Sequence, residues 1–437
     1  GRRDGDRHEQ DPLAWWQAVC DASREALRDV VPERVRGVAT CATSGTVLLV
    51  DGAGEPLTPG LMYDDARAGE QAARIGGGMS PSWGLPKLEW MLDAWPQLAR
   101  GGARLAHQAD VVTRRLAGCD VPSDSSHALK SGYDQLHERW SPDAPAELMP
   151  EVVRSGTLLG EVCERAAGQT AIPAGTPLYA GMTDGCAAQL AAGALRDGDW
   201  NAVLGTTLVL KGFSSQHVRD PAAVLYSHRA PGGGWMPGGA SSTGAGVLSA
   251  RYPDRDLDEL GRRGAAFERT SVLAYPLVSR GERFPFAAAD AQAFVLGEPA
   301  CEAELFAALL QGVAFVERLC FDYVDLLGAP TGGELTLTGG ATRSRAWCQL
   351  RADVLGRAVR LVQQPQPAVG MAILAASGGG DPARAADAIV RTSEVLQPRP
   401  ARGPWLTEQY LRLVEELAAR GWLGAPLAQH ARARAGI

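Results

Sequence analysis

The stretch GMTDGCAAQLAAG, residues 181–193, places one carboxylate where a strand pattern changes to a helix pattern. Apolar residues before Thr183 indicate a strand, and small residues after Gly185 indicate a helix. Asp184 at this junction has the chemistry of a general base that removes a proton from a hydroxyl group. Asp followed by Gly is also typical of a tight turn or a helix start, so the residues alone leave both interpretations open.

Two glycine-containing turns have the composition of a nucleotide site. Gly205, Thr206 and Thr207 form a small polar tip between two β runs, where backbone amides and paired hydroxyls suit a terminal phosphate. Gly339 and Gly340 end a β run before a helix, as in turns that let a backbone approach a nucleotide. Both turns also have purely structural explanations. No G-x-x-x-x-G-K-[ST] pattern and no Rossmann fingerprint occur, so an ATP site would not be of the P-loop kind.

The elements that must position these residues alternate between strands and helices. Residues 35–57 and 199–213 each predict two strands around a small polar loop, so we expect two hairpins with polar tips. Residues 333–362 predict a βαβ-like unit with the two glycines at its strand-to-helix turn. Helices are expected after Asp11-Pro12, over most of 84–118, over about 300–327 and over the amphipathic tail 404–424.

Composition narrows the function classes. The chain has 437 residues with 45% hydrophobic content, which favours two domains. Its net charge of -7 and the lack of a Lys/Arg block argue against nucleic acid or an anionic membrane as partners. Eight cysteines are scattered without C-x-x-C or zinc spacing, and no membrane-span or signal-peptide pattern occurs. We therefore expect a cytoplasmic protein with a small-molecule substrate, and a homodimer stays open.

The order of the motifs is more specific than any single motif. TSGTVLLVDGAGEPL is followed by MYDDARA, PKLEWMLDAWP, GMTDGCAAQLAAG, LGTTLVLKG, GERFPF and TGGATRSRAWCQLRADVLGRAV. Over about residues 8–425 this series resembles the FGGY-family carbohydrate kinases, in particular members like the D-ribulose and xylulose kinases. The resemblance implies an α/β protein with two ribonuclease-H-like domains, as in actin, Hsp70 and sugar kinases, and an interdomain cleft. It implies a sugar-binding domain over 1–193 and an ATP-binding domain over 194–437.

Residue roles follow from the same resemblance. Asp184 matches the catalytic aspartate that also hydrogen-bonds the attacking sugar hydroxyl. Ser44 and Gly45 lie in the loop that contacts the sugar in family members. The implied ATP-binding residues are Gly205, Thr206, Thr207, Gly339, Gly340 and Ser344, the last at a position that is Asn in many relatives.

A further element of the family, W-x-D-x-R, is matched by Asp65 and Arg67, with Tyr63 in place of the Trp. Contact with the ligand and a structural ion pair are both open interpretations of this pair.

The resemblance implies ATP-dependent phosphorylation of a sugar hydroxyl, with ATP and Mg²⁺ as cofactors and no protein metal ligand assigned. Xylulose kinases carry Met-His-Gly, and glycerol kinases Arg-Glu-Thr, where this chain reads TSGT, residues 43–46. Because the small hydroxyl-bearing loop resembles that of D-ribulose kinases, the terminal hydroxyl of D-ribulose is the first expected acceptor. D-xylulose, or another ketose or polyol, is the second.

One family block is missing from the sequence. Family members begin with a hairpin whose D-x-G-T loop contacts phosphate and metal, and we expect an upstream segment to carry it. A chain that truly lacked this loop would be a catalytically inactive sugar- or nucleotide-binding relative, which is the alternative from another class. An ATPase chaperone or an actin-like filament protein is a third class, disfavoured by GERFPF and TSGT.

Overall fold

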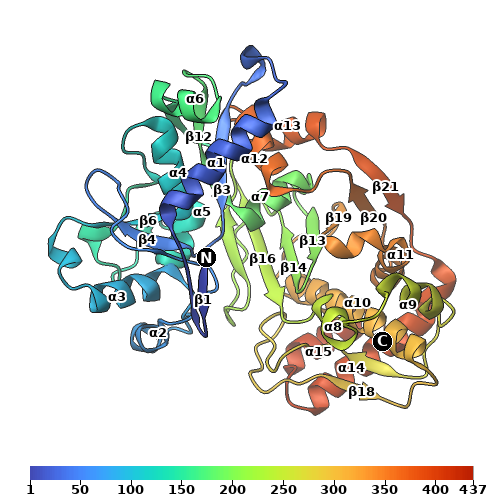
Figure 1. The fold of residues 1–437 in the computed structure, drawn as a ribbon. Coiled ribbons are helices and arrows are strands. Elements are labelled where there is room, and N and C mark those ends of the chain that lie inside the picture. Colours follow the sequence, from blue (N-terminus) through green and yellow to red (C-terminus); the bar gives the residue numbers. More distant parts are fainter. Residues whose placement is uncertain (437) are drawn as a thin grey trace. The chain divides into compact units, whose positions relative to one another are not determined.

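The computed structural model describes residues 1–436, apart from the side chain of Arg100. Contacts between residues divide the chain into two units. Unit 1 comprises Gly1–Ala191, His228–Gly233 and Gln366–Ile389, and unit 2 comprises Ala192–Ser227, Gly234–Pro365 and the chain from Val390 onward. Each unit is therefore assembled from separate stretches of sequence, as the colours of Figure 1 show.

Unit 1 has a five-stranded sheet of order β1-β2-β5-β4-β6 and a three-stranded sheet of order β11-β12-β3. Its strands are β1 (Arg2–Asp4), β2 (Arg7–Gln10), β3 (Val38–Ala42), β4 (Val47–Val50), β5 (Gly60–Leu61), β6 (Arg104–His107), β7 (Ser123–Asp124), β8 (Tyr133–Asp134), β9 (Arg139–Trp140), β10 (Val152–Val153), β11 (Leu158–Glu161) and β12 (Pro177–Thr183). Its helices are α1 (Pro12–Leu27), α2 (Gly69–Ile75), α3 (Gly84–Ala94), α4 (Gln108–Ala117), α5 (Ser125–Ala128), α6 (Glu164–Thr170), α7 (Asp184–Ala191), α12 (Pro367–Ala376) and α13 (Pro382–Ile389).

The three-stranded sheet carries the helix α7. β12 pairs in parallel with β3, and α4 and α12 pack against both strands. α7 follows β12 directly and packs along α12, which comes from late in the sequence (Figure 1). A Cβ atom on Gly370 of α12 would lie 1.9 Å from the carbonyl oxygen of Ala187, so only glycine permits this approach of the two helices.

Unit 2 is built on a seven-stranded sheet of order β15-β16-β14-β13-β19-β20-β21, and β17 pairs with β18. Its strands are β13 (Trp200–Leu204), β14 (Leu208–Gly212), β15 (Tyr226–Arg229, of which the first two residues belong to unit 2), β16 (Trp235–Ser241), β17 (Leu273–Tyr275), β18 (Phe294–Leu296), β19 (Leu335–Thr338), β20 (Val359–Val362) and β21 (Thr392–Leu396). Its helices are α8 (Gly246–Arg251), α9 (Leu257–Gly264), α10 (Glu302–Leu326), α11 (Arg345–Leu355), α14 (Gly403–Ala419) and α15 (Ala425–Arg434).

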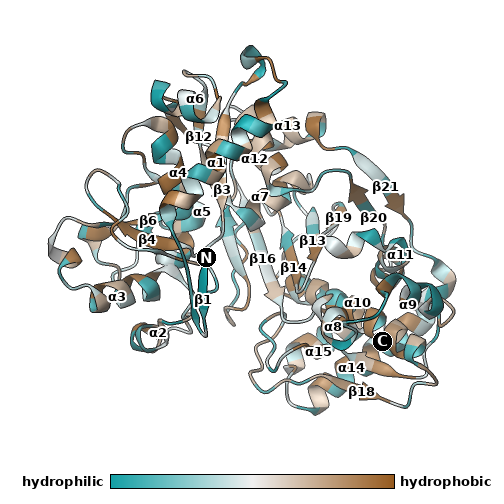
Figure 2. Ribbon diagram, viewed as in Figure 1, coloured by the Kyte–Doolittle hydropathy of each residue, from teal (hydrophilic) through white to brown (hydrophobic). Residues whose placement is uncertain are grey.

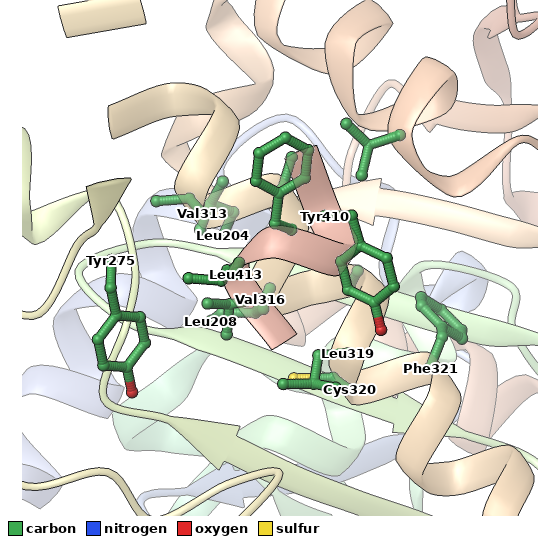
Figure 3. Packing of buried hydrophobic residues seen from close by; sticks show 14 of the residues in the cluster. Leu204, Leu208, Tyr275, Val313, Val316, Leu319, Cys320, Phe321, Tyr410 and Leu413 are labelled. Carbon is green, nitrogen blue, oxygen red and sulfur yellow. The ribbon is translucent and has the colours of Figure 1, made fainter. Parts of the chain in front are cut away.

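The core of unit 2 gathers side chains from the sheet and from α10 and α14. Leu204, Leu208, Val313 and Leu413 belong to one buried cluster and are at most 1% exposed (Figure 3). The hydropathy colours of Figure 2 show the contrast with hydrophilic elements such as β1 and α9. α10 is long and buried over most of its length because nearly all its faces are apolar.

Most predicted elements are confirmed. α1 begins after Asp11, whose side chain accepts a hydrogen bond from the Leu13 amide at 2.9 Å. β13 and β14 form the predicted hairpin around residues 205–207. β19, α11 and the parallel strand β20 form the predicted βαβ unit, and α10 and α14 lie where long helices were expected.

One prediction is wrong. Residues 35–57 do not form a hairpin, because β3 pairs with β12 whereas β4 pairs with β5 and β6 in the other sheet. The loop 43–46 therefore connects two sheets. Most of the stretch 84–118 is helical, as predicted, in α3 and α4, although β6 lies between them and pairs with β4. Tertiary pairing decides the failed hairpin, and short apolar runs carry no local signal of it.

A buried ion pair joins three elements of unit 2. The guanidinium of Arg351 on α11 contacts the carboxylate of Glu317 on α10 at 2.6 and 2.8 Å, and both side chains are fully buried. Its Nη2 atom also lies 3.4 Å from the carbonyl oxygen of Ala202 on β13. The bidentate geometry offsets the cost of burying both charges.

We predict that Arg351→Met lowers the free energy of unfolding by about 3 to 5 kcal/mol, because it leaves the Glu317 carboxylate buried without a counter-charge. Urea unfolding followed by tryptophan fluorescence measures the change. Arg345→Met is the control, since Arg345 lies on the same helix and is 66% exposed. Equal effects of the two substitutions would contradict the prediction, and Glu317→Leu combined with Arg351→Met should recover most of the loss.

Candidate active site

Asp184 is the first residue of α7, directly after β12. The predicted strand-to-helix junction is therefore confirmed. The side chain is half-buried, and its Oδ1 atom accepts a hydrogen bond from the Gly185 amide at 2.7 Å. A carboxylate at the start of a helix interacts favourably with the helix dipole, and it is a group that can act as a general base.

The parallel pairing of β12 with β3 brings the predicted sugar-site residues of unit 1 to one edge. Thr183 and Ala42 are register partners at the ends of the two strands, so Asp184 and Ser44 follow from neighbouring strand ends. A second observation agrees with this placement. Burial raises the pKa of the Cys41 thiol to about 11, and the nearby charge of Asp184 adds to the rise.

The loop of residues 43–46 presents a hydroxyl group without a partner. The hydroxyls of Thr43 and Thr46 lie 2.6 Å apart and bond to each other across the loop. The Oγ atom of Ser44 is buried and has no hydrogen-bond partner within residues 1–436. A buried polar atom without a partner is unfavourable unless a ligand or a water molecule satisfies it. Ser44 is thus suited to bind a hydroxyl group of a small molecule.

Lys87 on α3 supports this loop and was missed by the sequence analysis. Its Nζ atom is fully buried and donates to the carbonyl oxygens of Gly45, at 2.9 Å, and Met62, at 2.6 Å. Burial lowers the pKa of Lys87 to about 7, against the opposing effect of the Asp65 charge. A neutral amine has two N–H groups, which matches the two carbonyl acceptors. The position of Lys87 in the motif PKLEW was the one sequence signal that pointed to it.

Asp65 and Arg67 form an ion pair within unit 1. Arg67 contacts the carboxylates of Asp65 and Glu9, each at 2.7 Å, and lies over the Trp90 ring at 4.7 Å. Asp65 also accepts a hydrogen bond from the His8 amide at 2.7 Å. Of the two interpretations left open by the sequence, this geometry favours the structural one, in which the pair fixes β2 beside β5.

In unit 2, parallel strands again bring two predicted turns together. β13 and β19 are parallel neighbours with Val203 opposite Thr338, so the turn at 205–207 and the turn at 339–340 lie at the same edge. Gly339 has a φ of 89°, and a Cβ atom there would lie 2.5 Å from the carbonyl oxygen of Leu204. The close approach of the two turns therefore requires glycine at this position.

A third loop, Ser242–Ala245, wraps around the turn at 205–207. The Leu208 amide donates to the carbonyl oxygen of Thr243 at 2.7 Å, and the Ala245 amide donates to that of Gly205 at 2.8 Å. The buried carboxylate of Glu282 holds this loop, accepting from the Ser242 amide at 2.6 Å. Glu282 belongs to the GERFPF motif, but its contacts cannot be inferred from that motif.

The predicted ATP-binding residues are all placed at this edge. Thr206 and Gly340 are exposed, whereas Gly205, Thr207 and Gly339 are half-buried. Ser344 is the N-cap of α11, and its hydroxyl accepts from the Trp347 amide at 3.3 Å. Ser344 thus has a structural partner, and a contact with adenosine stays a prediction.

Residues 1–436 contain neither a metal-ligand cluster nor a membrane-spanning helix. No group of three or more His, Cys, Asp or Glu side chains is arranged to hold a metal ion there. Within the same residues, none of the helices combines the length and the apolar character needed to cross a bilayer.

The low pKa of Lys87 predicts a pH-dependent contribution to stability. Its ordinary pKa of 10.5 applies to the unfolded chain, and that of the folded protein is about 7. Between these values the unfolded chain binds more protons, so stability rises with pH by up to about 1.4 kcal/mol per pH unit relative to Lys87→Met, which cannot titrate. Urea unfolding of both proteins at pH 7, 8 and 9 measures this difference. A constant difference would contradict the prediction.

The contact of Gly339 with Leu204 predicts a selective loss of nucleotide affinity. Gly339→Ala adds a methyl group against the Leu204 carbonyl and should weaken ATP binding at least about tenfold, while sugar binding by unit 1 is retained. Calorimetric titration with ATP measures the effect. Gly332→Ala is the control, because Gly332 is exposed, lies just before β19 and has open space around its Cβ position. Unchanged affinity in Gly339→Ala would contradict the assignment.

Both units match domains of a known protein family. Residues 2–191 match the N-terminal domain, and residues 200–378 the C-terminal domain, of the FGGY family of carbohydrate kinases. An autoinducer-2 kinase of Klebsiella pneumoniae is 26% identical over 436 residues, which cover 88% of this chain and 81% of the relative. A xylulose kinase of Streptomyces rubiginosus is 29% identical over 414 residues, which cover 87% and 82%.

Solved structures agree with the sequence matches. The xylulose kinase from Rhodospirillum rubrum superposes with a TM-score of 0.85 at 26% identity, covering 96% of this chain and 92% of that one. A Plasmodium falciparum glycerol kinase, solved with ADP, has the same fold, with a TM-score of 0.83 at 17% identity over 95% and 91% of the two chains. The expected α/β architecture with two ribonuclease-H-like domains is confirmed. The chain is a phosphotransferase that belongs to the FGGY family of carbohydrate kinases.

Proposed function

We propose that this protein transfers the γ-phosphoryl group of ATP to the terminal hydroxyl of a ketopentose, with Asp184 as the general base. One observation carries the assignment. Asp184 begins α7 at the end of β12, beside the β3 loop in which the buried Ser44 hydroxyl has no partner within the described residues. A base and a hydroxyl-binding group at one edge of a sheet suit a small polyhydroxy substrate.

The chemistry needs little from the protein beyond alignment and a proton acceptor. A carboxylate oxygen of Asp184 takes the proton of the sugar hydroxyl while the hydroxyl oxygen forms a bond to the γ-phosphorus. The bond between the γ-phosphorus and the bridging oxygen breaks, and ADP leaves with the electron pair. We expect water to be excluded during this step, because it would compete with the sugar as the acceptor.

The nucleotide is assigned to the turns at 205–207 and 339–340, with Ser344 near the adenosine. The small, partly exposed residues of these turns leave the backbone accessible to phosphate. Mg²⁺ is expected to be held mainly by the ATP phosphates and to neutralise their charge.

D-ribulose is our first candidate for the acceptor, and D-xylulose is the second. The sequence TSGT at residues 43–46 supports D-ribulose, because a small hydroxyl-bearing loop replaces the Met-His-Gly of typical xylulose kinases. The names of relatives such as the Streptomyces rubiginosus xylulose kinase support D-xylulose. We also infer a reducing, cytoplasmic location, which the eight free cysteines support.

We predict that Asp184→Asn lowers turnover by about 10² to 10⁴-fold, because the amide cannot accept the proton. ADP release in a coupled assay, with a panel of D-ribulose, D-xylulose, glycerol and autoinducer-2, measures turnover and ranks the acceptors. ATP binding should stay within about twofold of wild type by calorimetry, since Asp184 lies in unit 1.

Asp21→Asn is the matched control, because Asp21 is an exposed aspartate of unit 1 with 64% of its side chain accessible. It should leave turnover unchanged. Near-normal turnover of Asp184→Asn would refute its role as base. ADP release that no acceptor raises above the basal rate would favour a sugar- or nucleotide-binding protein without kinase activity.

A further inference from the structure

A buried cluster of three side chains lies beside the ends of β3 and β12 in unit 1, the edge to which the sugar is assigned. Asp124 ends β7, and Ser126 and His127 follow it in α5. The Asp124 carboxylate accepts from the Ser126 hydroxyl at 2.6 Å and from the His127 Nδ1 atom at 2.5 Å, as well as from the amides of both residues. None of the three residues is more than 4% exposed. We call these residues the Asp124 cluster.

The Asp124 cluster makes two hydrogen bonds to distant strands. The Ser126 Oγ atom accepts from the Thr183 amide at 2.9 Å, and the His127 Nε2 atom lies 3.2 Å from the carbonyl oxygen of Ala42. Thr183 and Ala42 are the register partners that end β12 and β3. The cluster thus contacts the backbone immediately before Asp184 and two residues before Ser44.

The number of available protons fixes the direction of these bonds. The single hydroxyl proton of Ser126 goes to Asp124, so its oxygen is left to accept from the Thr183 amide. His127 faces a carboxylate on one side and a carbonyl on the other, and neither can donate a proton. Both ring nitrogens therefore donate, and the ring is an imidazolium.

The charges around His127 support this protonation state. Burial alone would lower the pKa of His127, but the charge and hydrogen bond of Asp124, together with the charge of Asp110, raise it to about 9. The ring of His107 lies 5.9 Å away and bonds to Asp110, Ser123 and Ser131.

Capping of α5 does not account for the whole arrangement. The Asp124 carboxylate alone caps the helix, through the amides of Ser126 and His127. Neither the Ser126 hydroxyl nor the His127 ring is needed for that cap, yet both are buried, and each bonds to a different strand end. We propose that Ser126 and His127 are positioning residues for phosphoryl transfer, which hold the ends of β12 and β3 so that Asp184 and Ser44 engage the same substrate. This inference rests on the proposed role of Asp184 as base.

The two residues should have separable effects. Ser126 acts on the backbone before Asp184, so Ser126→Ala should lower kcat by about ten- to a hundredfold through misplacement of the base, with the KM for ATP within twofold of wild type. His127 acts on the strand that leads to Ser44. In His127→Gln both N–H groups are on one nitrogen, so the side chain can reach only one of the two acceptors. The substitution should therefore raise the KM for the sugar about tenfold, with a smaller change in kcat.

Ser131→Ala is the matched control for Ser126→Ala. Ser131, like Ser126, is a fully buried serine, and its Oγ atom lies 3.0 Å from the Nε2 atom of His107. None of its hydrogen bonds within the described residues reaches β3 or β12. It should lower the unfolding midpoint about as much as Ser126→Ala and leave kcat within twofold of wild type. Equal kcat values for Ser126→Ala and Ser131→Ala would overturn the proposal.

A double-mutant cycle separates this inference from the proposed function. If Ser126 acts through Asp184, adding Ser126→Ala to Asp184→Asn should not lower the residual turnover further. A further loss of about tenfold would overturn the proposal. Near-normal turnover of Asp184→Asn alone would refute the assignment of the base, whereas loss in Asp184→Asn with normal turnover in Ser126→Ala would refute only the positioning role.

Hydrogen exchange provides a measurement that does not depend on activity. Ser126→Ala removes the acceptor of the Thr183 amide, so a peptide that contains residues 178–184 should exchange faster than in wild type and in Ser131→Ala. Unchanged exchange in that peptide would overturn the proposal, even if the variant folds too poorly for kinetics.

Discussion

The parallel pairing of β3 with β12 is the constraint on which the candidate active site of unit 1 depends. Parallel strands point their carboxyl ends to the same edge of a sheet, so Ala42 and Thr183 become neighbours although they are far apart in sequence. Ser44 and Asp184 follow these strand ends, so the strand pairing alone places them at the same edge of the sheet. Unit 2 uses the same rule, since β13 and β19 bring the turn at 205–207 beside Gly339.

Buried polar side chains then hold in place the loops that the strand pairing brings together. Lys87 donates to the carbonyl of Gly45, and Glu282 accepts from the amide of Ser242, so in each unit a deeply buried side chain holds a loop of the candidate site. Both groups bond to backbone atoms. Hydrogen bonds to the backbone do not depend on the side chains of the loop residues. Such loops can therefore change their residues and keep their path, as TSGT differs from other family members.

The sequence allowed prediction of local elements and of the motifs that carry the candidate site. The strand-to-helix junction at Asp184, the hairpin around residues 205–207 and the βαβ unit near Gly339 follow from short-range periodicity and turn chemistry. The failed hairpin at residues 35–57 shows what periodicity omits, namely which strand is the partner of another. The PKLEW motif marks the position of Lys87 but not its burial, because the carbonyl groups that accept its hydrogen bonds come from other segments of the chain.

The contact between α7 and α12 has a consequence for how the protein is made. α7 bears Asp184 near the middle of the chain, but the glycine that lets α12 approach it is residue 370, and the stretch 366–389 belongs to unit 1. A nascent chain that has emerged only as far as α7 therefore has no partner for one apolar side of that helix. Unit 1 can finish folding only after most of unit 2 has been synthesised, so the helix that begins with the proposed general base is completed among the last parts of the protein.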